Sequence, residues 1–403
     1  MKKLGTETAF NVSDEACELV SNGKKIYPFH LGDMNIRTPS RIIEATKKAM
    51  DRGKTGYCPS AGIPDLREAV AKEIGETRGL NLAKENVSVQ PGGKPVIAKF
   101  ILAFMDPGDE VLYPNPGYPI YESQILFHGG IAKPYCFRAK EDGFALDLES
   151  IEKSITPKTK LLTFNNYQNP IGAEAGEEEM RRLADICVKH DLLVLSDEAY
   201  FDITYSGERK SIASYPGMFE RTLILYTFSK AFAMTGWRLG AAIGPEWMVK
   251  EITRLNVNDE SCSNHFIQWG ALEALKHCKE DMKKIVDTLR ERRDVACEIL
   301  NRIKGVKVVK PNSTFYLFPD ITEAMRNLGF KDVEEFRKFI LDTTGVSFCT
   351  RKHFGVPTDG EDREYIRLAY SGIGVEDIKE GLLRFKETVE NPKIVKKWRE
   401  VKK

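Results

Sequence analysis

One short segment holds residue types that could bind and react with a phosphorylated aldehyde. It reads Thr227-Phe228-Ser229-Lys230, and Arg238 follows eight residues after the lysine. A lysine among apolar neighbours gives up its proton more readily, and its neutral amine can then attack a carbonyl to form a Schiff base. The hydroxyls and the guanidinium suit phosphate oxygens. Pyridoxal 5′-phosphate (PLP) carries an aldehyde and a phosphate, so the segment predicts a PLP site.

The residues before this segment strengthen the interpretation. Taken alone, Lys230 and Arg238 are more simply explained as surface charges. However, the apolar run 222–227 predicts a buried strand that ends at the hydroxyls. Ligands of α/β sheets bind just beyond the carboxyl ends of strands. The lysine therefore stands where such a sheet would place a site.

The pattern of elements around the segment predicts that kind of sheet. From about residue 60 to 245, helical periodicity alternates with short apolar runs, which indicates an α/β domain with a mostly parallel sheet. The expected strands are 86–89, 110–113, 160–164, 192–195 and 222–227, and the expected helices include 95–105 and 175–190. A long helix, 281–304, leads into a smaller α+β domain with strands near 306–309, 314–318 and 365–369.

These elements divide the 403 residues into a large and a small domain. We expect residues 51–290 to form the large, cofactor-binding domain and residues 291–403 the small domain. The N-terminal segment, residues 1–50, is expected to pack with the small domain.

Composition excludes several classes of function. The charged residues nearly cancel, with 60 Lys and Arg against 59 Asp and Glu, so no overall field favours nucleic acid or an anionic membrane. The apolar runs are too short for a membrane span, and the N-terminus lacks the apolar core of a signal peptide. We therefore expect a protein with no nucleic-acid or membrane partner.

The eight cysteines and six histidines argue against a metal site. No two cysteines form a Cys-x-x-Cys pair, and the histidines show no paired helical spacing. This pattern predicts free thiols in a reducing cytoplasm and no bound metal.

Polar residues at other expected strand ends could complete a PLP site. Asp197 and Tyr200 follow the strand 192–195, where a buried carboxylate could keep a pyridine nitrogen protonated and a phenol could bind the ring hydroxyl. Asn169 follows another strand, and its amide could bind the same ring oxygen or a substrate carboxylate. Taken alone, these residues fit a surface acid, a partly buried tyrosine and an Asn-Pro turn equally well.

Two further motifs fit the phosphate and the ring face. Gly92-Gly93-Lys94 opens a helix and offers free backbone N–H groups, although a glycine-rich turn is a weak signal by itself. Tyr118 stands in a proline-rich loop, where it could stack on a planar group or pack on the surface. The succession of all these motifs at strand ends favours a common site.

The whole set of motifs resembles the class I/II aminotransferases of the fold-type I PLP enzymes. The resemblance covers nearly the whole chain and includes Gly32-Asp33, Tyr57, Gly62-Ile63-Pro64-Asp65-Leu66-Arg67 and Tyr365-Ile366-Arg367-Leu368-Ala369. It implies an α/β large domain with a mostly parallel sheet of the seven-stranded type. It also implies a PLP-dependent aminotransferase that works by a ping-pong exchange.

The resemblance assigns a role to each candidate residue. Lys230 would form the Schiff base and carry the proton at the substrate Cα, and Asp197 would pair with the ring nitrogen. Asn169 and Tyr200 would bind the ring oxygen, and Tyr118 would stack on the ring. The phosphate would be held by Gly93, the backbone of Lys94, Thr227, Ser229 and Arg238.

The family also implies a homodimer with shared active sites. Tyr57 would reach the phosphate of the neighbouring subunit, whereas the sequence alone favours a core tyrosine in a turn. Arg367 would bind the substrate α-carboxylate with help from Gly32 and Asn169, although by itself it reads as a surface arginine.

The substrate stays open at this point. The amino donor could be aspartate-, alanine- or glutamate-like, with a 2-oxo acid such as 2-oxoglutarate as acceptor. Arg351, Lys352 and His353 stand where many family members have a neutral loop, so they could bind a side-chain carboxylate or form an exposed basic loop. A carbon–sulfur lyase of the same fold and a PLP-binding regulator without turnover are the alternative functions.

Overall fold

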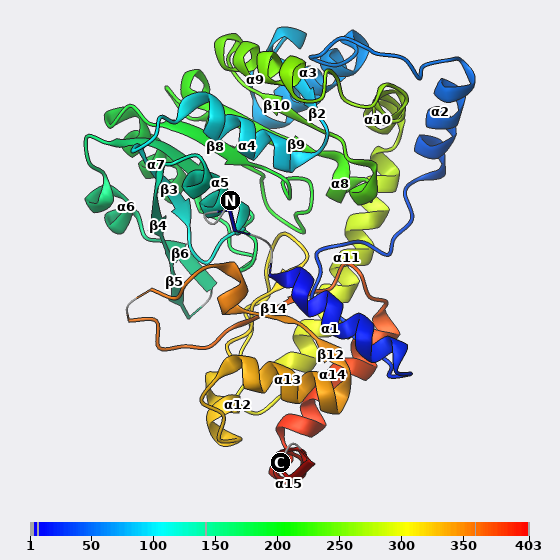
Figure 1. Ribbon diagram of the computed structural model, residues 1–403, viewed down its shortest axis with the longest axis vertical. Helices are drawn as coiled ribbons and strands as arrows, with labels where there is room; N and C mark the ends of the chain where they lie inside the picture. Colours follow the sequence, from blue (N-terminus) through cyan, green and yellow to red (C-terminus); the bar gives the residue numbers. More distant parts are fainter. Residues whose placement is uncertain (1–3, 6–7, 142, 359, 402–403) are drawn as a thin grey trace.

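A seven-stranded sheet forms the centre of the larger part of the molecule (Figure 1). The computed structural model describes residues 4–5, 8–141, 143–358 and 360–401. The strand order is β2–β10–β9–β8–β7–β3–β4, and only β10 runs antiparallel to its neighbours. The strands are β2 (Val87–Gln90), β3 (Glu110–Pro114), β4 (Ile131–Tyr135), β7 (Thr159–Phe164), β8 (Leu193–Asp197), β9 (Thr222–Thr227) and β10 (Gly240–Ile243). The predicted α/β fold with a mostly parallel sheet is thus confirmed.

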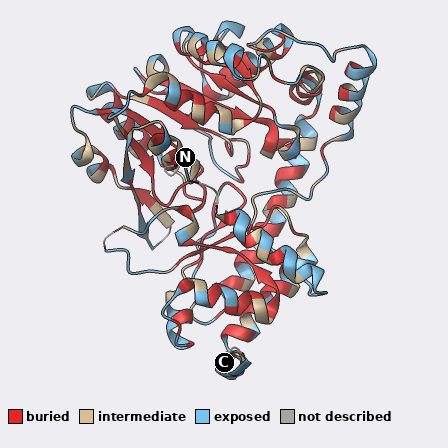
Figure 2. Cartoon of the chain, viewed as in Figure 1, coloured by how far each residue is buried: buried red, intermediate tan, exposed pale blue. Residues whose placement is uncertain are grey.

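Helices cover both faces of this sheet. Every residue of β2, β9 and β10 is buried (Figure 2). Burial on both faces explains why β9 and β10 read as largely apolar runs without alternation. In β2 the buried polar residues Ser88 and Gln90 hydrogen-bond to each other's side chains. The helices of this part are α3 (Pro64–Arg78), α4 (Gly93–Phe104), α5 (Ile120–Phe127), α6 (Leu148–Ser154), α7 (Glu177–Lys189), α8 (Phe228–Ala231), α9 (Glu246–Asn258) and α10 (His265–His277). A hairpin of β5 (Phe137–Lys140) and β6 (Gly143–Leu146) lies beside them.

The smaller part contains two short sheets and several helices. Its three-stranded sheet has the order β11–β14–β13, and β1 pairs with β12 in parallel. The strands are β1 (Tyr27–Pro28), β11 (Tyr316–Leu317), β12 (Val346–Ser347), β13 (Cys349–Thr350) and β14 (Ile366–Ala369). The helices are α11 (Lys279–Leu300), α12 (Thr322–Asn327), α13 (Val333–Thr344), α14 (Val375–Val389) and α15 (Pro392–Val401), and α11 runs between the two parts (Figure 1).

One predicted strand, 306–309, is absent from the described residues. Lys307 forms both backbone hydrogen bonds of a single bridge with Asp320. The next N–H, that of Val308, instead donates to the side chain of Asn301 at 3.0 Å. Within the described residues this bridge is isolated, so the segment forms no strand.

The first fifty residues do not all lie with the smaller part. β1 pairs with β12, and Ala9 and Val12 of α1 (Ala9–Ser21) pack on Cys349 and Phe354. In contrast, α2 (Ser40–Asp51) packs on α10 in the larger part. A Cβ at Gly270 would lie 2.1 Å from the Thr46 hydroxyl, so glycine permits this close approach. The expectation for residues 1–50 was therefore wrong for α2.

In the described part of the chain, no helix is both long enough and apolar enough to cross a membrane.

Candidate functional site

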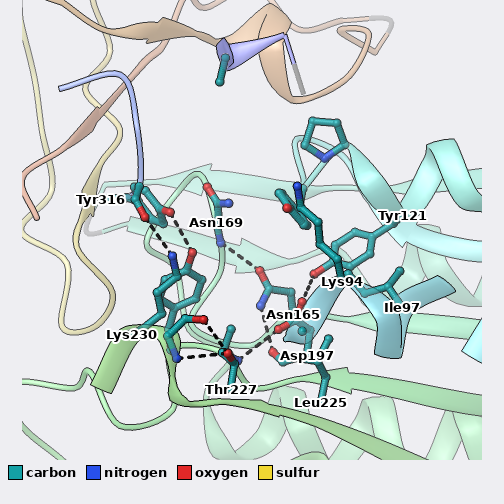
Figure 3. Close-up of a pocket in the computed structure, with 18 of the residues that line it drawn as sticks. Lys94, Ile97, Tyr121, Asn165, Asn169, Asp197, Leu225, Thr227, Lys230 and Tyr316 are labelled. Atoms are coloured by element: carbon teal, nitrogen blue, oxygen red, sulfur yellow. Dashed lines mark hydrogen bonds between the residues drawn. The ribbon is translucent and has the colours of Figure 1, made fainter. Parts of the chain in front are cut away.

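A pocket of about 200 Å³ opens at the carboxyl ends of the parallel strands, between the two parts of the molecule (Figure 3). Every predicted site residue except Tyr57 lines it. These residues are Gly32, Gly93, Lys94, Tyr118, Asn169, Asp197, Tyr200, Thr227, Ser229, Lys230, Arg238 and Arg367. The structure thus gathers side chains that are far apart in the sequence.

Lys230 lies on α8, the short helix that follows β9 directly. The helix begins there because the Thr227 hydroxyl caps it and accepts from the Ser229 N–H at 3.2 Å. The Lys230 Nζ donates to the carbonyl of Gly32 at 2.9 Å and lies 5.4 Å from the centre of the Phe315 ring. The amine therefore sits inside the pocket, between the sheet and the N-terminal segment.

Asp197 is the last residue of β8 and is buried. Its Oδ2 accepts from the Tyr121 hydroxyl at 2.6 Å, and its Oδ1 accepts from the Ala199 N–H at 3.1 Å. Burial raises the pKa of Asp197 to about 6, while these two hydrogen bonds and the Lys230 charge act to lower it. Both donors are neutral, so the carboxylate has a strong remaining capacity to bind a cationic N–H.

Two asparagines tie the loop after β7 to the end of β8. Asn165 Nδ2 donates to the Asp197 carbonyl at 2.9 Å, and its Oδ1 accepts from the Asn169 N–H at 3.0 Å. The Asn169 side chain is thereby held beside Arg367. Sequence reasoning missed Asn165 and Tyr121. Asn165 directly follows a predicted strand, which was the available signal for it.

Arg238 and the start of α4 form one end of the pocket. Gly92, just before α4, has φ 106°, and a Cβ there would lie 2.3 Å from Arg238 Nη2. Glycine is therefore required for the guanidinium to approach this backbone. The Arg238 Nη1 donates to the Thr235 carbonyl at 2.9 Å, and the Thr227 and Ser229 hydroxyls are 2.9 Å apart. Hydroxyls, a guanidinium and the first N–H groups of a helix make this end suited to an anion.

Arg367 lies on β14 and is buried. Its Nη1 donates to Asn169 Oδ1 at 3.1 Å, and its Nη2 donates to the His30 carbonyl at 2.5 Å. The guanidinium carbon lies 4.6 Å from the ring centres of both Tyr316 and Phe354. Its Nε has no hydrogen-bond partner among the described residues. A buried cation with spare donor capacity fits a carboxylate ligand.

Tyr316 is a further residue that sequence reasoning did not find. Its hydroxyl lies 2.8 Å from the hydroxyl of Tyr200. A Cβ on Gly32 would come within 2.2 Å of the same hydroxyl, so this wall of the pocket needs glycine. The sequence carries no motif around Tyr316, since its place depends on a contact across 116 residues.

Tyr57 lies outside this pocket, and 87 % of its surface is exposed. The alternative of a core tyrosine is therefore excluded. An aromatic side chain of this size on the surface is available to contact another molecule.

The three basic residues predicted to act together have three different environments. Arg351 is buried, and its Nε and Nη2 donate to the Glu361 carboxylate at 2.9 and 3.0 Å. Lys352 forms an exposed ion pair with Asp332 at 2.7 Å. Of the three, only His353 lines the pocket. Arg351 thus belongs neither to an exposed loop nor to the pocket wall, because Glu361 holds its charge elsewhere.

The chain is similar to known proteins over nearly its whole length. Residues 25–385 match the model of the family described as aminotransferase class I and II. A probable aspartate/prephenate aminotransferase of Aquifex aeolicus is 36 % identical over 392 residues, 96 % of this chain and 97 % of the relative. An aromatic-amino-acid aminotransferase 2 of Thermococcus litoralis is 34 % identical over 94 % of this chain and 95 % of its own.

Solved structures show the same likeness in three dimensions. The aspartate aminotransferase of Thermus thermophilus with maleate superimposes with a TM-score of 0.87 at 32 % identity. The match covers 96 % of this chain and 97 % of that one.

Proposed function

This chain belongs to the class I and II aminotransferases, and we propose that its cofactor is PLP held by Lys230. The enzyme moves an amino group from an amino acid to a 2-oxo acid. The observation that carries the proposal is the meeting of Lys230, Asp197 and Arg367 in one pocket. They provide an amine for an aldehyde, a buried carboxylate for a ring nitrogen and a guanidinium for a substrate carboxylate.

The donor set of the pocket fits PLP. Asp197 is buried between two neutral donors, so a protonated pyridine nitrogen would give this carboxylate a cationic partner. The phosphate would occupy the anion-binding end, where Gly93, the Lys94 backbone, Thr227, Ser229 and Arg238 line the pocket. Asn169 and Tyr200 would bind the ring oxygen, and Tyr118 would stack on the ring.

When bound, PLP supplies an electron sink that stabilises negative charge at the substrate α-carbon. Asp197 supports this property because its carboxylate would keep the ring nitrogen protonated. Tyr121 holds the same carboxylate in place through its 2.6 Å hydrogen bond. Burial removes competing water from this interaction.

Lys230 and Arg367 would act on the substrate. Arg367 would bind the α-carboxylate with Asn169 and Gly32, which fixes the orientation of the α-carbon. The Lys230 amine would take the proton from that carbon and return it on the cofactor side. In the ping-pong exchange, the oxo-acid product of the first half-reaction would leave before the 2-oxo acid substrate of the second half-reaction binds.

We further propose a homodimer, with Tyr57 of each subunit contacting the phosphate in the other. The support is the 87 % exposure of Tyr57, which leaves its ring available to a second subunit. We also propose a cytoplasmic location, because all eight cysteines are free thiols.

The amino donor is proposed to be aspartate-, alanine- or glutamate-like, with 2-oxoglutarate as acceptor. Two relatives carry names that mention aspartate, prephenate or aromatic amino acids. Donor profiling with 2-oxoglutarate will rank these classes.

The test of the cofactor is reconstitution of the purified protein with PLP. Wild-type protein should gain the absorbance of a PLP Schiff base and show parallel double-reciprocal lines with two substrates. Lys230→Ala should lose both features while Lys352→Ala keeps them. Full turnover by Lys230→Ala would overturn the proposal, and release of ammonia in place of amino transfer would favour the lyase alternative.

A further inference from the structure

His353 is the member of the basic run Arg351–His353 that faces the pocket. It lies in the short helical turn Arg351–Phe354, directly after β13. Arg351 and Lys352 are held by Glu361 and Asp332, so their charges are engaged away from the pocket. Of the three basic side chains in this turn, only the imidazole therefore faces the pocket.

Hydrogen bonds determine which ring nitrogen of His353 can donate. The Thr350 N–H donates to Nδ1 at 3.1 Å, and the direction of this donor is set by the backbone. Nδ1 must then be the acceptor, which places the ring proton on Nε2. The Thr350 hydroxyl also lies 2.9 Å from Nδ1, but its hydrogen can rotate to Glu334. No described residue of the chain forms a hydrogen bond with Nε2, so its N–H is available to a ligand.

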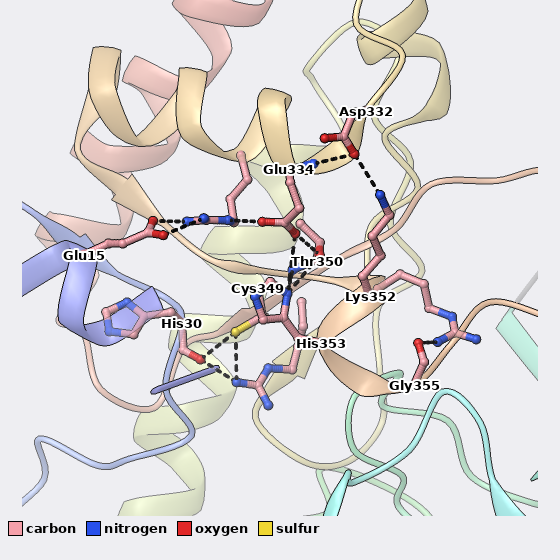
Figure 4. A network of polar contacts seen from close by, with 12 residues as sticks. Glu15, His30, Asp332, Glu334, Cys349, Thr350, Lys352, His353 and Gly355 are labelled. Carbon is pink, nitrogen blue, oxygen red and sulfur yellow. Dashed lines mark hydrogen bonds and ion pairs between the residues drawn. The ribbon is translucent and has the colours of Figure 1, made fainter. Parts of the chain in front are cut away.

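A chain of ion pairs keeps this geometry fixed (Figure 4). Glu334 accepts from the Thr350 hydroxyl and pairs with Arg337 at 2.7 Å. Arg337, which is buried on α13, pairs in turn with Glu15 of α1 at 2.8 Å. The orientation of the imidazole is thus supported from two separate helices.

The imidazole lines the same pocket as the Arg367 guanidinium, which would bind the substrate α-carboxylate. The residue next to it, Phe354, has its ring 4.6 Å from the Arg367 guanidinium. His353, Phe354 and Arg367 all line the same pocket. Burial lowers the pKa of His353, although the Glu334 charge opposes this shift. Burial thus favours the neutral imidazole, which can donate a hydrogen bond through Nε2.

We propose that His353 is a specificity-determining residue whose Nε2–H binds an oxygen atom of the substrate side chain. The enzyme would then favour amino acids that carry a carboxylate or carbonyl oxygen beyond the β-carbon. This inference rests on the proposed function, because it assumes that Arg367 binds the α-carboxylate. It also explains how one residue of the basic run could contribute to selectivity while its two neighbours do not.

The first experiment compares glutamate, glutamine and methionine as amino donors to the holoenzyme. These side chains are similar in length, and only methionine lacks an oxygen. In His353→Leu, the ratio of kcat/KM for glutamate to that for methionine should fall about 10- to 100-fold, as expected for a lost hydrogen bond to a charged group. His353→Gln should keep most of the preference, since its amide also carries a donor. The glutamine rate shows whether a carbonyl oxygen suffices.

The second experiment measures binding without turnover. Succinate and butyrate are titrated into the holoenzyme, and the change in cofactor absorbance gives each dissociation constant. His353→Leu should weaken succinate about 10- to 100-fold and leave butyrate nearly unchanged. Lys352→Ala is the matched control, because its side chain is exposed and lies outside the pocket.

Two results would overturn the inference. One is an equal glutamate-to-methionine ratio in wild type and His353→Leu when both variants bind PLP and melt at similar temperatures. The other is an equal loss of succinate binding in His353→Leu and His353→Gln. Either result leaves the proposed function intact as long as wild-type protein still transfers amino groups to 2-oxoglutarate. Absence of any transfer would instead contradict the proposed function itself.

Discussion

The two ends of the pocket differ in how the chain positions their side chains. We define the cofactor end as Asp197, Thr227, Ser229, Lys230 and Arg238. Asp197 and Thr227 are the last residues of the neighbouring strands β8 and β9, and the other three residues come after β9. At the substrate end, defined as Gly32, His353, Phe354 and Arg367, the residues come from distant segments. The hydrogen bond between Arg367 and His30 spans 337 residues.

This difference indicates which part of the pocket determines the cofactor and which part determines the preferred substrate. Adjacent parallel strands bring the cofactor end together through backbone pairing, so its geometry follows from the fold. The substrate end depends on contacts between side chains of separate elements. Changes in a few of these contacts could alter the preferred substrate without altering the sheet.

The largest expected effect comes from removing the amine at the cofactor end. Lys230→Ala should lower kcat by at least about 10²- to 10⁴-fold, the contribution of a positioned acid–base group. Stopped-flow measurement of the half-reaction checks this, and the melting temperature serves as a control for folding. Near-normal rates in a folded variant would remove Lys230 from the mechanism.

A change at the substrate end should separate binding of substrate from binding of cofactor. Arg367→Met should cost about 2–5 kcal/mol in kcat/KM, because a buried charged hydrogen-bonding partner is lost. The dissociation constant for PLP should stay within a few-fold of wild type, since Arg367 lies at the other end. An equal loss of both would show that the two ends do not act separately.

Asp197 should make the stability of the apoprotein depend on pH. Its pKa of about 6 in the folded state lies above the value of about 3.9 for an unfolded chain. The folded state therefore binds more protons between these values, and stability should fall by about 2 kcal/mol as the pH rises from about 4 to 6. Urea unfolding of Asp197→Asn should lack this contribution. Identical pH profiles for the two proteins would contradict the buried titration.

The smallest effect is expected for the exposed ion pair beside the substrate end. Lys352→Ala should change the free energy of unfolding by about 0–1 kcal/mol and leave the donor preference unchanged. Chemical denaturation and donor profiling check the two parts. A marked shift in donor preference would mean that the exposed charge acts on the pocket from a distance.

The same contrast explains how much could be predicted from the sequence. Asp197, Thr227 and Lys230 were found because each follows an apolar run that reads as a strand. Tyr121 and Tyr316 were missed, because their roles depend on hydrogen bonds to residues 76 and 116 positions away. No local pattern records such pairings.

The basic run Arg351–His353 shows the limit most clearly. Its three residues look alike in a charge pattern, and their separation into a buried pair, an exposed pair and a pocket residue is set by Glu361, Asp332 and Thr350. Likewise, the position of α2 on α10 depends on the absence of a side chain at Gly270. These outcomes require knowledge of which segments meet.

The stacking of Arg367 between Tyr316 and Phe354 has a consequence for affinity. A long arginine side chain gives up as much as about 2 kcal/mol of conformational entropy when it is ordered. Here the rings on both sides, with Asn169 and His30, order it as the chain folds. A carboxylate that arrives therefore meets a receptor whose disorder has already been removed, and binding carries little further entropic cost. The entropic cost of ordering Arg367 therefore lowers the free energy of unfolding. It does not weaken the binding of substrate.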